Sequence, residues 1–237
     1  TEVLDFIAQK NAASAPGERF IYSSYGYSVL GAIIESVSQQ RYEDYVRINI
    51  WQKAGMANTS LEHELDTPNK SRLYLKAGSF FIRSPRTDLS LIYAAGGIQS
   101  TTEDLVKFGT AILNNILISP ESLTQMIDAS NSLAPAAGDN PYGLGWYVRN
   151  DPINGKMIMH SGAQPGVNSS LKIYLEKGIV VAAISNAFGS QNSLANLSKE
   201  MEKLVLPQMH WLRLTSGTSP KNVIFIEQKE SMDEIDK

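Results

Sequence analysis

One serine of this chain is followed three residues later by a lysine, a spacing that on a helix brings a nucleophile and a base together. The pair is Ser169 and Lys172, and the sequence repeats this spacing nowhere else. A serine hydroxyl that attacks a carbonyl needs such a base beside it. The two residues lie in the β-prone run 169–175, however, and residues i and i+3 of a strand point to opposite faces. We therefore predict that Ser169 and Lys172 are not a catalytic pair.

Metal and thiol chemistry find little support in the sequence. Cysteine is absent, which excludes disulfides, thiol nucleophiles and cysteine-based metal sites. The three histidines, His63, His160 and His210, are scattered without the spacing of metal ligands. We expect no metal site and no cofactor.

Composition bounds the class of protein. The 237 residues suit one large domain or two lobes, and 43% hydrophobic with 19% charged residues is an ordinary globular balance. A net charge of −3 gives no electrostatic footprint for nucleic acid. No apolar run approaches the roughly 20 residues of a membrane-spanning helix. We expect no nucleic-acid partner and no membrane span in this chain.

The first part of the chain reads as helices followed by loops. Apolar spacing predicts a short amphipathic helix over residues 2–12, and the run Gly26–Val37 is apolar nearly all round, as in a buried helix. A further helix is expected over Tyr42–Trp51, with Gly55 as its stop signal. Residues 57–93 are polar and lack a sustained period, which indicates long loops.

Two further helices start with recognisable signals. Ser100 is followed three residues later by Glu103, the pattern of a capping box before an apolar helical run. Ser119 precedes Pro120, and proline is favoured at the first helical position. We expect helices to begin at both places.

The second part of the chain changes character to short β-prone runs. These runs, separated by Gly, Asn or Pro, predict an antiparallel meander over residues 144–149, 156–160, 169–175 and 179–186. A hairpin turn is expected at 174–179. An amphipathic helix over Asn196–Leu206 follows, and one more strand-like run covers Val223–Ile226.

Helices first, then strands and a last helix, predict an α+β fold in two lobes. The expected division is a helical lobe over 1–135, a strand meander with its closing helix over 136–206, and a C-terminal extension of unclear role over 207–237.

Four segments, in this order and spacing, carry a family resemblance. Over residues 1 to about 206 the chain resembles the serine β-lactamase, penicillin-binding-protein and esterase family, with class C β-lactamases among its members. Ser24, where most of that family has asparagine, is similar to the subgroup of the mitochondrial serine β-lactamase-like protein. The segments are Pro16–Gly31 (PGERFIYSSYGYSVLG), Ala95–Leu105 (AGGIQSTTEDL), Tyr142–Trp146 (YGLGW) and His160–Gly166 (HSGAQPG).

The resemblance implies a β-lactamase/transpeptidase-like fold and a catalytic role for Tyr22. In this family a lysine, one helical turn after the nucleophilic serine, shares the base role with a tyrosine that Tyr22 matches. A tyrosine acts as a base only if nearby cations lower its pKa from about 10. The alternative is that Tyr22 is an ordinary buried tyrosine near a helix start.

The resemblance also assigns His160 and three substrate-binding residues. His160 matches the lysine of the K-T-G strand and would supply a donor or a positive charge, the alternative being a half-exposed strand histidine. Ser24 would hydrogen-bond a substrate amide, or else cap the following helix. Ser161 would line the pocket through its hydroxyl, and Gly162 would let a substrate backbone approach the strand, whose amides would serve an oxyanion.

The nucleophile that the resemblance implies is not found in this chain. The family carries its Ser-x-x-Lys motif well before the matched tyrosine, yet 21 residues precede Tyr22 and none forms that motif. The family's first helix and first two strands are missing as well, which would leave an open sheet edge and an uncovered apolar face. We expect one of three remedies: another segment supplies the missing part, the tail from Pro207 partly covers it, or the chain self-associates.

Two classes of function follow. The chain is either the larger part of a serine hydrolase that acts on an amide or ester in a small molecule or peptide, or a non-catalytic binding or assembly module that retains the pocket. By analogy with the family, a periplasmic or extracellular location is favoured.

Overall fold

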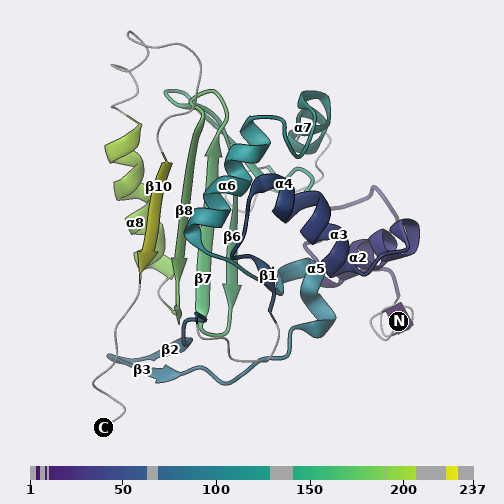
Figure 1. Cartoon of the computed structure of the whole chain (residues 1–237), viewed down its shortest axis with the longest axis horizontal. Helices are drawn as coiled ribbons and strands as arrows, with labels where there is room; N and C mark the ends of the chain where they lie inside the picture. Colours follow the sequence, from purple (N-terminus) through teal and green to yellow (C-terminus); the bar gives the residue numbers. More distant parts are fainter. Residues whose placement is uncertain are drawn as a thin grey trace.

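A twisted five-stranded sheet forms the centre of the described structure (Figure 1). The computed structural model describes residues 4–5, 9, 11–62, 69–128, 141–189, 191–206 and 223–228. The strand order is β10-β8-β7-β6-β5, and the strands are β5 (Tyr147–Asp151), β6 (Gly155–Gln164), β7 (Val167–Tyr174), β8 (Ile179–Ser185) and β10 (Val223–Gln228).

Strands β5 to β8 form the antiparallel meander that the sequence predicts. β7 pairs with β6 on one side and with β8 on the other. The predicted hairpin between β7 and β8 is present, with Tyr174 paired to Ile179 and Gly178 at a φ of 65°. Residues of β8 are buried almost without interruption because helices contact the strand from both faces.

One face of the sheet is covered by α6 (Thr102–Leu113). Its apolar side packs on Ile158, Ile173 and Val180 to form the main core. The helix begins as predicted but one residue later: the capping side chain is Thr101, whose Oγ1 accepts a hydrogen bond from the backbone N–H of Asp104, and not Ser100. The tertiary position of the helix start decides between two adjacent hydroxyl residues, which the sequence pattern cannot separate.

The other face of the sheet carries α8 (Gln191–Val205). This helix, predicted from Asn196 onward, begins five residues earlier. Met157, Tyr174 and Val181 form a smaller core on this face. Lys172 of β7 forms an ion pair with Glu202 of α8, so α8 is tied to the sheet by charge as well as by apolar contact.

The strand from the tail, β10, pairs with the outer edge of β8 in parallel orientation, from Val223 opposite Val180 to Gln228 opposite Ser185. Three arrangements were expected for the open sheet edge, and in the structure the tail strand β10 covers it.

Helices around α2 (Ser24–Ser38) form the second lobe, on the right in Figure 1. The sequence predicts α2 as a buried helix, and this is wrong. Only one narrow stripe of α2 is buried, at Ser28 and Gly31, where a Cβ on Gly31 would lie 2.6 Å from Cβ of Ala94. The apolar pattern runs all round the helix, but neighbours cover one side. Its exposed apolar side chains are Leu30, Ile33 and Val37.

The predicted helix Tyr42–Trp51 is present as a continuous helical stretch. It consists of α3 (Tyr42–Val46), a π-helical turn η1 (Arg47–Trp51) and α4 (Gln52–Ala54). Gly55 ends it in the left-handed conformation, at a φ of 71°, as the sequence predicts. The helix α7 (Pro120–Ile127) also begins as predicted, with Ser119 as its cap.

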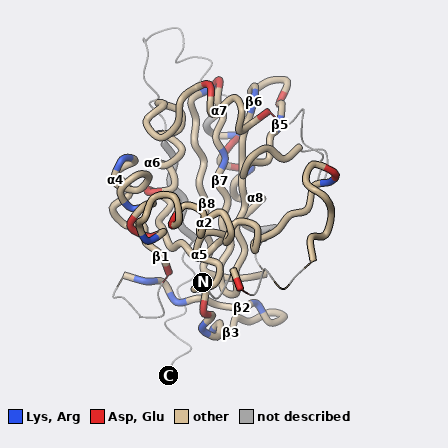
Figure 2. Tube along the Cα trace, turned by 90° about the vertical axis from the view of Figure 1, so that its right-hand side faces the viewer, with Lys and Arg blue, Asp and Glu red and all other residues tan. Residues whose placement is uncertain are grey.

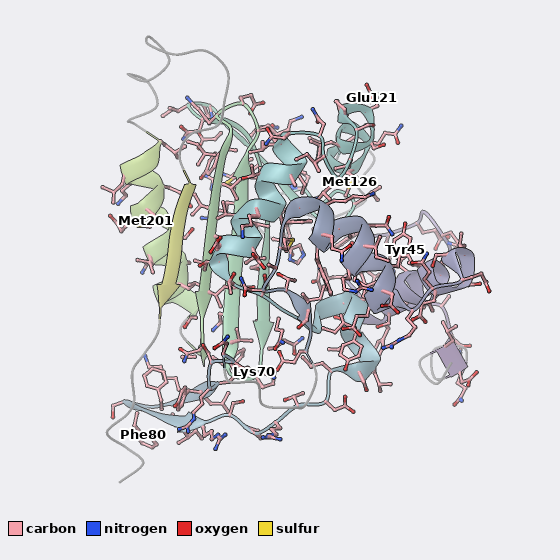
Figure 3. The ribbon with its side chains drawn as sticks, in the orientation of Figure 1. Tyr45, Lys70, Phe80, Glu121, Met126 and Met201 are labelled. Carbon is pink, nitrogen blue, oxygen red and sulfur yellow. The ribbon has the colours of Figure 1, made fainter. Side chains whose placement is uncertain are left out.

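The prediction of loops over 57–93 is wrong in part. This stretch contains the strands β1 (Ser60–Leu61), β2 (Tyr74–Ala77) and β3 (Phe80–Arg83), the 3-10 turn η2 (Ser90–Ile92), and the start of α5 (Tyr93–Gly96). β1 pairs with β4 (Ile98–Gln99), whereas β2 pairs with β3 and with β9 (Ala187–Phe188), which lies far along the chain. Phe80 is exposed at the outer end of the β2–β3 hairpin (Figure 3).

Several predictions fall on residues outside those described. They concern most of the helix at 2–12, the loop at 63–68, and the histidines His63 and His210. Acidic and basic residues are interspersed along the described chain (Figure 2). Within the described ranges no helix has the length and apolar character that crossing a membrane requires.

Candidate active site

Tyr22 and His160 lie side by side, although they come from distant parts of the chain. Their ring centroids are 6.3 Å apart, with the rings 27° from parallel. Tyr22 stands on the loop before α2, and the side chain of Ser23 caps that helix by accepting a hydrogen bond from the N–H of Gly26. His160 lies near the middle of β6. The start of α2 and the strand β6 thus meet at this pair of rings.

A cluster of aromatic rings surrounds His160. Tyr142 is the hub of the cluster, with ring centroids 5.2 Å from Phe20, 6.0 Å from Tyr22 and 4.7 Å from Tyr147. Tyr142 is only 7% exposed, whereas Tyr22 is 55% exposed. The ring cluster is therefore buried at Tyr142 and open to solvent at Tyr22.

Both ring nitrogens of His160 have protein partners. Nδ1 is 2.7 Å from the backbone carbonyl oxygen of Ser161, and Nε2 is 3.0 Å from the hydroxyl of Tyr142. A carbonyl oxygen only accepts hydrogen bonds, so Nδ1 carries a proton. In the neutral ring Nε2 then accepts from Tyr142. Sequence reasoning expected a donor or charge for a substrate here, and in this arrangement both nitrogens are already engaged.

The surroundings of Tyr22 favour its neutral form. Burial raises the pKa of Tyr22 above the ordinary value of 10.0, and the neighbouring phenols of Tyr147 and Tyr27 raise it further. A catalytic base requires the opposite shift, which a nearby cation would cause. As the described residues stand, Tyr22 is a protonated phenol at neutral pH.

Ser24 is the first residue of α2, and it does not cap the helix. The cap is Ser23, so the alternative role considered for Ser24 is wrong. The backbone carbonyl of Ser24 accepts a hydrogen bond from the hydroxyl of Ser28, 3.3 Å away. The role of Ser24 toward a substrate stays a prediction.

Ser161 and Gly162 follow His160 on β6, but they do not share one face. Alternation along the strand puts Gly162 on the face of His160 and Ser161 on the face of Met159, toward α8. A Cβ on Gly162 would lie 2.4 Å from Oγ of Ser169, so a larger residue here would require the Ser169 hydroxyl to move. The structure brings Tyr22, His160 and Gly162 to one side and Ser161 to the other.

One edge of the last part of β6 has no strand partner among the described residues. β5 pairs with β6 only as far as Met159, opposite Tyr147. Beyond this point, no strand among the described residues pairs with this side of β6, from His160 to Gln164. Backbone N–H groups on such an edge can donate to an extended ligand or to a carbonyl oxygen.

Ser169 and Lys172 do not form a pair, as predicted. Ser169 lies against Gly162 on the His160 face, whereas Lys172 is bound to Glu202 on the α8 face. Groups of three or more metal-binding side chains are likewise not found within the described ranges.

Tyr142 is the residue that sequence reasoning missed. Its segment, Tyr142–Trp146, contributes to the family resemblance, but the resemblance assigns no role to the tyrosine. Its place in that segment is the signal in the sequence, because glycines beside a tyrosine do not by themselves fix where its ring points. Its partner, His160, is set by the packing of β5 against β6.

Comparisons with known proteins support the family resemblance. The family model described as Beta-lactamase matches residues 1–204. A penicillin-binding protein of Bacillus subtilis is 27% identical over 188 residues, which are 72% of this chain and 40% of the relative. The mitochondrial serine β-lactamase-like protein LACTB of Mus musculus is 27% identical over 228 residues, covering 79% of this chain and 41% of the relative. The chain thus spans about two fifths of the length of these relatives.

Solved structures show the same fold. A penicillin-binding protein from Bacillus halodurans superposes with a TM-score of 0.70 at 21% identity, covering 84% of this chain and 62% of the other. The octameric penicillin-binding protein homologue from Pyrococcus abyssi also gives 0.70, at 26% identity, covering 91% of this chain and 52% of the other. The prediction of a β-lactamase/transpeptidase-like α+β fold is confirmed, and the chain belongs to the β-lactamase family.

Proposed function

We propose that this chain is part of a serine hydrolase of the β-lactamase family, acting on an amide or ester through an acyl-enzyme, with the nucleophilic serine contributed by a segment outside this sequence. The observation that carries the proposal is the apposition of Tyr22 and His160, with ring centroids 6.3 Å apart. Both residues stand at positions that match catalytic positions of the family, on segments that are separate in sequence.

Each residue has a role in the proposed reaction. Tyr22 takes the proton of the attacking serine and returns it to the leaving group. The open edge of β6 beyond Met159 provides backbone N–H groups for the substrate and its oxyanion, with Gly162 allowing close approach. Ser24 supplies a hydroxyl contact to the acyl group, and the ring of His160 lies beside Tyr22. Ser161, on the α8 face of β6, takes no part in this arrangement.

The electrostatics of Tyr22 support a contribution from another segment. Its pKa is raised, first by burial, and a phenol in that state is a poor base. An ammonium group beside the phenol would lower the pKa by stabilising the phenolate. A serine and a lysine one helical turn apart, brought in on one helix, would supply the nucleophile and this cation together.

A groove on the α8 face supports the same proposal. It has a volume of about 1140 Å³ and lies over β5, β6 and β7 beside α8. Its lining includes apolar side chains, among them Met157, Met159 and Leu194, and basic ones such as Arg149 and Lys199. An apolar sheet face of this kind is normally covered by a further element.

A second candidate, a non-catalytic binding or assembly module, draws on the state of the same site. Both nitrogens of His160 are engaged and Tyr22 is neutral, so the described residues hold these two rings together without an activated group.

Active-site labelling tests the proposal. The 237-residue chain, incubated with a fluorophosphonate or penicillin probe and examined by mass spectrometry, is expected to show no adduct. The protein restored with its upstream coding sequence should be labelled at the serine of an upstream Ser-x-x-Lys motif. A restored protein that reacts with neither probe would favour the binding module, and an adduct on Ser169 of the short chain would contradict the proposed arrangement.

A further inference from the structure

The segment Tyr142–Trp146 is folded so tightly that the direction of Tyr142 is fixed. The N–H of Gly143 donates to the carbonyl of Trp146 at 2.7 Å, and a Cβ on Gly143 would lie 2.2 Å from the carbonyl oxygen of Met126. Gly145 has a φ of 85°, in the left-handed region that favours glycine. An isolated β-bridge joins Tyr142 to Tyr147. Both glycines are therefore required for a turn that aims Tyr142 at β6.

The proton positions around Tyr142 follow from its partners. Nδ1 of His160 donates to the carbonyl of Ser161, which leaves Nε2 of the neutral ring as an acceptor. The one group within hydrogen-bond distance of Nε2 among the described contacts is the Tyr142 hydroxyl, at 3.0 Å, and it must therefore be the donor.

The environment of Tyr142 keeps its hydroxyl protonated. Burial, and then the neighbouring Tyr27, raises the pKa of Tyr142 well above that of an ordinary phenol. A hydrogen-bonded chain therefore runs from the Tyr142 hydroxyl through His160 to the carbonyl of Ser161.

We propose that Tyr142 is a positioning residue of this site, whose hydroxyl fixes both the orientation of His160 and the tautomer protonated at Nδ1. A hydrogen bond to one ring nitrogen decides which nitrogen carries the proton in a neutral histidine. With both nitrogens held, the imidazole presents its flat face to Tyr22 and has no free N–H for a ligand. The imidazole ring of His160 is then held in one orientation beside the ring of Tyr22.

The proposal is tested on the 237-residue chain, without need of activity. In ¹⁵N-histidine NMR at alkaline pH, where imidazoles are neutral, wild-type His160 is expected to carry its proton on Nδ1 and an unprotonated, hydrogen-bonded Nε2, with the resonances assigned through His160→Gln. In Tyr142→Phe the ring packing is kept and only the hydroxyl is lost, so the Nε2 resonance should move toward the value of a free lone pair.

Chemical reactivity gives a second readout. Diethyl pyrocarbonate acylates an imidazole nitrogen that has a free lone pair, and peptide mapping separates His160 from His63 and His210, which serve as internal references. Tyr142→Phe should increase the rate at His160 about tenfold, the factor that corresponds to about 1.4 kcal/mol and to the upper range of one hydrogen bond. Tyr147→Phe is the matched control, because its ring lies 5.6 Å from that of His160 while both nitrogens have other partners.

The outcomes separate clearly. A wild-type His160 protonated at Nε2 would overturn the proposal even if Tyr142→Phe failed to fold, and so would an unchanged rate and spectrum in a folded Tyr142→Phe. The functional consequence rests on the proposed hydrolase. In the restored protein, Tyr142→Phe should raise KM more than it lowers kcat. Absence of any activity would count against the hydrolase and leave the tautomer result standing.

Discussion

Gly109 of α6 lies against Val180 of β8 so closely that a Cβ on the glycine would be 2.6 Å from Cγ1 of the valine. This contact seats the helix on the sheet, at the centre of the main core. The position is helical, so the reason for glycine is space and not backbone conformation.

Gly109→Ala should therefore destabilise the chain by about 1–3 kcal/mol, the range for overpacking a core. Urea denaturation followed by circular dichroism measures it. Gly26→Ala is the control, because a Cβ there meets nothing closer than 3.6 Å and alanine favours the helix. Equal stability of the wild type and Gly109→Ala would show that α6 moves away from β8 at little cost.

Lys172→Ala should lower stability by about 1–3 kcal/mol, since it leaves the carboxylate of Glu202 partly buried without its cation. It should leave probe labelling of the restored protein unchanged, because Lys172 faces away from His160. Lys203→Ala, which breaks the exposed pair with Glu200, is the control and should cost less than about 1 kcal/mol. Loss of labelling with intact stability in Lys172→Ala would mean that Lys172 takes part in catalysis.

Tyr22→Phe in the restored protein should reduce kcat by about 10²–10⁴-fold, the usual effect of losing a general base. The ring stays, so its stacking on His160 and the stability of the protein should change little. Tyr45→Phe, in the separate core around Trp51, is the control for loss of a phenol elsewhere. Turnover that survives Tyr22→Phe would remove the role proposed for this residue.

Stability should fall as pH rises above about 10. Burial raises the pKa of Tyr142 and of Tyr174 above the unfolded value of 10.0, so the unfolded chain releases these protons first. Their contribution is complete below that pH and is lost above it, by up to about 1.4 kcal/mol per pH unit for each phenol. Urea midpoints measured from about pH 8 to 11 should fall less steeply for Tyr142→Phe, and an identical slope would contradict the shift assigned to Tyr142.

Elements marked by a local sequence pattern could be predicted from the sequence, whereas elements that depend on a single tertiary contact could not. The strands from β5 to β8 follow from short β-prone runs and turn residues, and the end of α4 follows from Gly55. The hairpin of β2 and β3 was missed because each strand has four residues and the further partner is β9, which no local pattern announces.

The candidate site was predictable to the same extent. Tyr22 and His160 were identified through the family motifs that surround them, and the structure places their rings together. The face occupied by Ser161 and the bond from Tyr142 to His160 depend on strand register, which a sequence of isolated motifs does not contain.

The parallel strand β10 has a consequence for any partner of the sheet. It follows β8 through α8, so the last part of the chain forms a β-α-β crossover attached to an antiparallel meander. The outer edge of β8 has one row of backbone donors and acceptors, and β10 occupies it from Val180 to Ser185. A strand from another segment can pair with this edge of β8 only if it displaces β10. The tail and such a strand therefore compete for the same backbone donors and acceptors.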